Sequence, residues 1–244
     1  MKNSNFKYGI ILLYIIIFVF FYYYPIQIKT VNNIFLTIST FLFTIFTGFF
    51  ISRQGSRYTK IREIVANFDG EMSALYRYAG YFSKDFSEKI GSIIKKHYQT
   101  ILDHNAWDYH FVNKSETITN IHEVMQNSLK DQNLPSLTNQ AVTNIFRSLG
   151  NLQMLRKQMI MLHQEHIPKF EMGFIYFLSC ILLINVSIIP SYGVILDSVL
   201  KASFIVSLIA VVIILKSLDN LKFFEGTIGS SSANDVIEII NGNK

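Results

Sequence analysis

The chain has 244 residues, of which 50% are hydrophobic and 16% charged, and its mean hydropathy is +0.29. This composition excludes a disordered chain and is unlike that of an ordinary soluble domain. The formal net charge is +5, and much of the Lys and Arg stands beside long apolar runs. Membrane orientation explains that placement better than DNA binding does, so we expect no nucleic-acid partner.

Four apolar runs stand in two pairs around a polar middle. Each reaches or nears the roughly 20 residues that a helix needs to cross a bilayer. We therefore predict an all-α, polytopic membrane protein that has four transmembrane helices in two hairpins, with a helical cytoplasmic bundle between them. The predicted order is a span at 8–26, a span at 34–51, cytoplasmic helices at 52–168, spans at 170–189 and 194–215, and a tail at 216–244.

The basic residues predict how the chain is oriented in the membrane. They cluster before the first run, after the second, before the third and after the fourth, as at Lys7, Arg53, Lys169 and Lys216. The two hairpin connections hold few of them. By the positive-inside rule both termini and the middle are cytoplasmic, which in a bacterium means the inner membrane.

The second run continues without a stop signal into an amphipathic stretch that reaches about residue 82. Apolar residues recur there every three or four positions, the spacing of a helix that packs on other helices. We predict one long helix that ends near Ser83, whose hydroxyl caps the next helix. The packing candidates, buried within and between subunits, are Ile61, Val65, Phe68, Met72 and Leu75.

Three further helices are predicted in the polar middle, and no strand pattern competes with them. They cover 85–103, 115–130 and 137–167, and the last leads through Pro168 into the third span. The buried side of the first of these helices is predicted to comprise Ile90, Ile93, Ile94, His97 and Ile101.

The search for catalytic chemistry finds no phosphate loop, nucleophile elbow or zinc motif, so we predict neither an enzyme nor a cofactor. His97, His104 and His110 are spaced by seven and six residues, which does not suit a helical metal site, and no metal is predicted. Trp107 is interpreted as a core or turn anchor. The lone Cys180 excludes an intrachain disulfide and is expected to be a buried, inert thiol.

The second run carries a hydroxyl stripe, with apolar side chains on the adjoining face. Threonines at three- and four-residue intervals can serve close helix packing, because they bond back to their own helix. They can equally line an aqueous path in which phenylalanines form a hydrophobic constriction. Both interpretations stay open. The pore-lining candidates are Thr37, Thr40, Phe41, Thr44, Ile45, Thr47 and Phe49.

Three segments together resemble the bestrophin-like family of bacterial membrane proteins, a domain of unknown function. At 49–82 arginines follow a span and Glu71 precedes Ala-Leu-Tyr-Arg; at 148–170 Arg156 stands ahead of the proline that opens the third span. The tail at 218–240 has a Leu-Asp pair, Phe-x-Gly and an amphipathic end, although its link is longer than in the family. The Arg-Phe-Pro motif and the acidic calcium-binding run of authentic bestrophins are missing, so calcium gating is unsupported.

The resemblance covers nearly the whole chain and implies a single bestrophin-like domain over residues 1–244. It implies a homo-oligomer in the lipid bilayer, a pentamer around an axial anion pore lined by the second span. Two functions stay open. One is an anion (chloride) channel; the other is a membrane-anchored cytoplasmic scaffold or stress-response interaction protein without transport activity.

Overall fold

The structure is a computed structural model that describes residues 2–24, 33–129, 136–189, 194–222 and 229–242. The residues in those ranges form helices and turns and no β-strand, which confirms the all-α prediction. The helices are α1 (Lys2–Tyr23), α2 (Asn33–Gly80), α3 (Lys84–His104), α4 (Tyr109–Val112), α5 (Thr117–Leu129), α6 (Ser136–Gln164), α7 (Lys169–Ile188), α8 (Val194–Asp219) and α9 (Gly229–Ile240).

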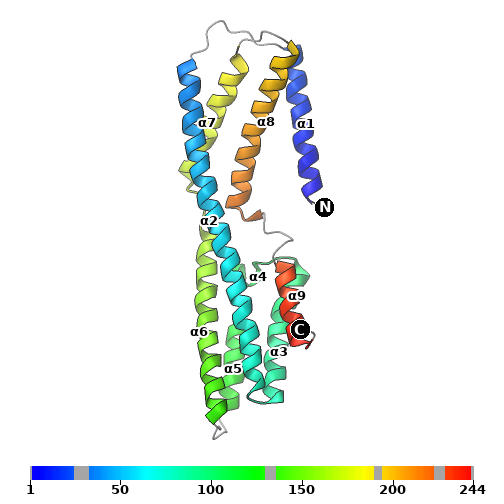
Figure 1. Ribbon diagram of the computed structural model, residues 1–244, viewed down its shortest axis with the longest axis vertical. Helices are drawn as coiled ribbons and strands as arrows, with labels where there is room; N and C mark the ends of the chain where they lie inside the picture. Colours follow the sequence, from blue (N-terminus) through cyan, green and yellow to red (C-terminus); the bar gives the residue numbers. More distant parts are fainter. Residues whose placement is uncertain (1, 25–32, 130–135, 190–193, 223–228, 243–244) are drawn as a thin grey trace. The chain divides into compact units, whose positions relative to one another are not determined.

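The chain divides into two compact units, and α2 contributes to both. Unit 1 comprises Met1–Gly55 and His166–Asn220, and unit 2 comprises Ser56–Glu165 and Leu221–Lys244. In unit 1, α8 packs against α1 and against α7 (Figure 1). The buried apolar side chains of unit 1 form two clusters, one around Phe43 and Leu182 and the other around Phe21.

Three stretches within the described residues are long and apolar enough to cross a membrane. They lie within Ile34–Gly80, Asn139–Ile188 and Ile195–Asp219, which cover the second, third and fourth predicted spans to within one residue at an end. The apolar part of α1, Tyr8–Tyr23, is shorter than a usual span. The hairpin connections at 25–32 and 190–193 lie outside the described residues. The first span and the two-hairpin layout therefore stay predictions.

The long second helix and its end are confirmed. α2 runs for 48 residues to Gly80. Ser83, in extended conformation, then caps α3: its hydroxyl accepts a hydrogen bond from the Phe86 backbone N–H at 3.1 Å. At the other end of α3, Asn105 takes the left-handed conformation at φ 47°, and its backbone N–H bonds to carbonyls of the last turn.

Unit 2 is a helical bundle with one apolar core, in which α3 lies beside α9 and α5 (Figure 1). Ile61, Phe68, Met72 and Leu75 are each at most 3% exposed, and Val65 is half-buried against the same core. These five packing candidates thus lie inside the bundle of their own chain. Their burial between subunits stays a prediction.

The remaining helix predictions hold with shifts of a few residues. Most of the predicted buried side of α3 is buried, and Ile93 is half-buried against the core. α6 ends at Gln164 rather than 167. Pro168, which disfavours the helical conformation at Ile167, stands at the start of α7. Trp107 joins the core of unit 2, as expected. The prediction of a buried Cys180 is wrong, because its side chain is exposed on α7.

Candidate functional site

The apolar half of α2 has one face covered by its own chain and one face left open. Phe43 and Phe50 are 8% and 2% exposed and pack into the larger apolar cluster of unit 1. Phe41, Ile45 and Phe49 are 64%, 49% and 59% exposed. They are four residues apart, which on a helix is about 6 Å of rise per step, so they form a continuous apolar ridge.

The threonine stripe divides between these faces. Thr37 and Thr44 are exposed, Thr40 is half-buried, and Thr47 is only 4% exposed. Every hydroxyl whose bond the structure defines donates to its own helix: Thr40 to the Leu36 carbonyl at 2.8 Å, Thr44 to Thr40 at 2.8 Å and Thr47 to Phe43 at 2.6 Å. A pore lined by this helix would thus be shaped chiefly by the phenylalanine and isoleucine side chains.

A polar cluster around Asp219, which the sequence did not indicate, joins the start of α7 to the end of α8 in unit 1. The Asp219 carboxylate accepts hydrogen bonds from the Ile167 backbone N–H at 2.7 Å and the Gln54 side-chain amide at 3.3 Å. His166 Nδ1 lies 3.4 Å from the second carboxylate oxygen. Gln54 is 1% exposed. This polar cluster holds the segment before α7 against the last turn of α8, which is a structural role.

Another buried polar side chain closes the end of α6 in unit 2. Arg57, 3% exposed, donates from Nε to the Leu162 carbonyl at 2.7 Å and from a terminal nitrogen to the His163 carbonyl at 3.0 Å. A cation among the last carbonyls of a helix satisfies them and complements the helix dipole. The sequence showed a basic cluster here but could not distinguish the buried Arg57 from its exposed neighbours.

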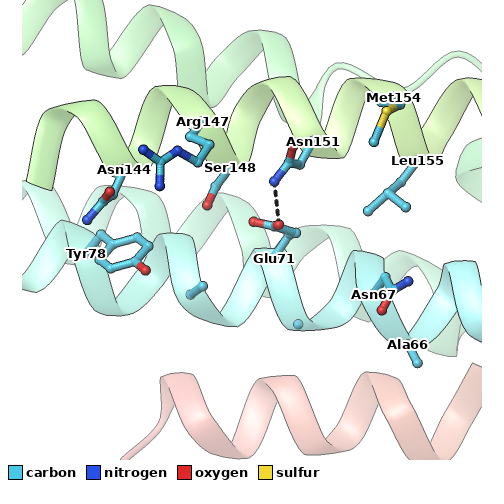
Figure 2. Close-up of a pocket in the computed structure, with 12 residues that line it drawn as sticks. Ala66, Asn67, Glu71, Tyr78, Asn144, Arg147, Ser148, Asn151, Met154 and Leu155 are labelled. Atoms are coloured by element: carbon cyan, nitrogen blue, oxygen red, sulfur yellow. Dashed lines mark hydrogen bonds between the residues drawn. The ribbon is translucent and has the colours of Figure 1, made fainter.

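An open groove of about 540 Å³ lies between α2 and α6 in unit 2 (Figure 2). Its centre is the hydrogen bond from the Asn151 amide to the Glu71 carboxylate, at 2.7 Å. Asn144 and Arg147 of α6 lie along the same groove (Figure 2). Gly70 of α2 also lines it. Amides and opposite charges of this kind suit a polar contact surface.

The three histidines do not form a metal site. Among the residues that the structure describes, no group of three or more His, Cys, Asp or Glu could hold a metal ion. His104 is exposed and its Nδ1 lies 3.0 Å from the Thr100 carbonyl. His97 and His110 do meet, ring on ring, inside unit 2.

These observations define a class: an all-helical protein with several helices of membrane-spanning length and a helical bundle outside them. The Bestrophin-like domain family matches residues 16–223, and the chain therefore belongs to the bestrophin-like family. It is a multi-pass membrane protein. Two of the three segments behind the sequence resemblance, 49–82 and 148–170, fall wholly inside the matched range, and the tail segment falls inside it only to residue 223. A search of curated proteins and a search of solved structures each found no match.

Proposed function

We propose that several copies of this chain form an anion channel whose pore is lined by α2. The observation that carries this proposal is the open face of α2. Phe41 and Phe49 are 64% and 59% exposed, so their own chain does not cover them. The resemblance to the family implies an axial pore. Of the two faces of α2, this open face is the one available to point toward the axis of that pore.

The side chains on this face support conduction of anions through an apolar neck. Rings of Phe41, Ile45 and Phe49 contributed by several copies would form a constriction that controls ion flow by dewetting. Arg53, exposed one turn beyond Phe49, would place a ring of positive charge at one mouth. Such rings of arginine attract anions to a pore. No cofactor or metal enters this scheme.

The proposed orientation in the membrane follows from the distribution of the basic residues along the chain. Both termini and unit 2 lie in the cytoplasm, α1 is the first of four spans, and the protein sits in the plasma membrane of a bacterium. The resemblance favours five copies. The scaffold function has its own support in the polar groove of α2 and α6, a surface suited to a cytoplasmic partner.

Two threonines of α2 provide a matched test of the proposal. Both donate to the backbone four residues earlier, but Thr44 is exposed and Thr47 is 4% exposed. Thr44→Leu should reduce chloride flux in liposomes several-fold without lowering the melting temperature, because it narrows the bore and replaces a hydroxyl there by an apolar group. Thr47→Leu should instead lower the melting temperature through overpacking, at a cost of about 1–3 kcal/mol.

Phe41→Ala extends the test to the neck. Removing a large apolar ring from a constriction makes dewetting less favourable, so flux should stay the same or rise. The readout is a chloride-sensitive dye inside liposomes containing purified protein. A homogeneous monomer in mild detergent, or no flux above empty liposomes from an oligomeric sample, would remove the channel proposal and leave the scaffold.

A further inference from the structure

Unit 2 contains a second cavity, of about 520 Å³, whose largely apolar lining also holds cationic and polar side chains. α3, α4 and α6 contribute His97, His110, Arg156 and Lys157, and α5 contributes its first residues. No Asp or Glu lies among the lining residues. A concave surface that has two permanent positive charges and no carboxylate attracts anions.

His110 is buried in this cavity with one ring nitrogen satisfied and the other not. Its side chain is 8% exposed. Nε2 lies 2.9 Å from the His97 carbonyl, which can only accept, so Nε2 carries the proton. Nδ1 is buried without a hydrogen-bond partner. The ring cannot turn freely, because it stacks on the His97 ring at 3.8 Å between centroids and 15° between planes.

Two further groups of the same cavity suit a negatively charged ligand. Arg156 Nε is buried without a hydrogen-bond partner, so this guanidinium holds an unused donor. Thr117, Ile118 and Thr119 of the first turn of α5 line the cavity as well. The first N–H groups of a helix lack partners within it and stand at the positive end of its dipole. Helix N-termini of this kind bind phosphate and sulfate.

We propose that this cavity binds a tetrahedral oxyanion, a phosphate group or its sulfate analogue, and takes up a proton on His110 when it does so. Arg156 supplies the fixed charge and the unused Nε donor. His110, once protonated, donates from Nδ1 to an anion oxygen while Nε2 keeps its bond to the His97 carbonyl. The apolar part of the lining, with Phe111 and Ile118, leaves room for the carbon portion of a phosphate ester.

The charges around His110 give the sign of the proton coupling. Burial lowers the pKa of His110 first, the hydrogen bond to the His97 carbonyl raises it, and the Arg156 and His104 charges lower it again. Empty, the site therefore holds a neutral imidazole at neutral pH. A bound anion favours the protonated imidazole, which offsets the effect of burial and of the two cations on its pKa. The pKa of His110 therefore rises on binding, and the affinity for the anion increases as pH falls.

Other titratable and charged groups lie near the ring. The pKa of His97 is held well below its usual range by burial, then by His110 and Arg156, so it stays neutral. Its Nδ1 lies 2.9 Å from the Thr117 hydroxyl. Arg156 and Lys157 are the basic side chains that α6 contributes to the lining. Asp108, two residues before His110, lies 3.0 Å from His163 Nε2, and the α2 residue of the cavity, Phe68, does not titrate.

Calorimetric titration of the full chain in detergent tests the proposal without any flux measurement, so its outcome is separate from that of the channel. Sulfate is the probe for pH dependence, because its own charge is constant from pH 5.5 to 7.5. We expect sulfate to bind about tenfold more tightly at pH 5.5 than at pH 7.5. His110→Gln should abolish this difference. Arg156→Met should weaken binding at least tenfold, whereas Arg147→Met removes an equal charge elsewhere on α6 and should not.

A second arm distinguishes the source of the phosphate group. Inorganic phosphate and phenyl phosphate are titrated at a single pH, and the tighter ligand shows whether the site takes a free ion or an ester. Circular dichroism confirms that each variant is folded. Equal weakening by Arg156→Met and Arg147→Met, a pH dependence that survives His110→Gln, or no binding of any probe would each overturn the proposal.

Discussion

The half-buried carboxyl of Asp69 on α2 shows how one residue ties distant parts of unit 2 together. Its Oδ1 accepts a hydrogen bond from the Tyr98 hydroxyl of α3 at 2.5 Å, and its Oδ2 accepts one from the Ser232 hydroxyl of α9. Tyr76 adds a bond from its hydroxyl to the Ile240 carbonyl at 3.2 Å. The terminal helix is thus held by polar contacts besides its apolar face.

Asp69 makes a pH-dependent contribution to stability that can be predicted with its sign. Burial raises the pKa of Asp69, and the hydrogen bonds from Ser232 and Tyr98 only partly oppose this. The folded state therefore binds the proton more tightly than the unfolded chain. The stabilisation is present when the carboxyl is protonated and is lost as pH rises from about 3.8 through the raised pKa.

Asp69→Asn should remove this dependence. The amide oxygen can still accept one of the two hydrogen bonds and carries no charge that burial penalises. The free energy of unfolding of the variant, relative to the unmodified protein, should rise between pH 4 and pH 7. Chemical denaturation followed at several pH values measures the difference. Glu88→Gln, which removes an exposed carboxyl on α3, is the control and should show little change over this range. A difference that falls with pH would contradict the assignment.

At the scale of an element, α2 is long because its sequence contains no residue pattern that ends a helix. No proline interrupts it, and its apolar face changes partners along its length, from the spans of unit 1 to the bundle of unit 2. The end comes only where Tyr81 and Phe82 form a turn and Ser83 begins the next helix. Capping therefore decides where the chain reverses.

The Ser83 cap can be tested by itself. Ser83→Ala removes the acceptor for the Phe86 N–H and should lower the free energy of unfolding of the bundle by about 1 kcal/mol. The matched control is Ser92→Ala on the same helix, since the Ser92 hydroxyl is exposed and donates to the Lys89 carbonyl within the helix. Chemical denaturation with a probe in unit 2 compares the two. Equal losses would show that the cap has no special role.

At the scale of the whole molecule, orientation in the membrane follows from the distribution of charge. Arginines and lysines flank the predicted spans on one side, and by the positive-inside rule we propose that this side faces the cytoplasm. The chain's only thiol is exposed, so accessibility experiments need it replaced first.

In a Cys180→Ser background, single cysteines at Glu88 and at Ser191 should label differently in intact cells. A membrane-impermeant thiol reagent should react at Ser191, which lies outside the described residues, and not at Glu88 of α3 until the cells are opened. Labelling at Glu88 but not at Ser191 would show the opposite orientation. Labelling of both in opened cells is the control for reactivity.

The sequence by itself determined the features that depend on local pattern. Apolar runs located the membrane-spanning helices, the three- and four-residue spacing located the core of unit 2, and Ser83 located the start of α3, because hydrophobic burial and capping act over a few neighbouring residues. The degenerate motifs of three segments were also enough to indicate the family.

Only the tertiary structure decided which chemically similar residues differ. It separated the exposed Thr44 from the buried Thr47, and the buried Arg57 from the exposed Arg53. It also brought His97 and His110 into one stack beside Arg156. Their sequence spacing gave no sign of this, since the contact depends on how α3, α4 and α6 pack around the cavity. Burial and hydrogen-bond satisfaction are properties of packed surroundings, and neighbours along the chain do not specify them.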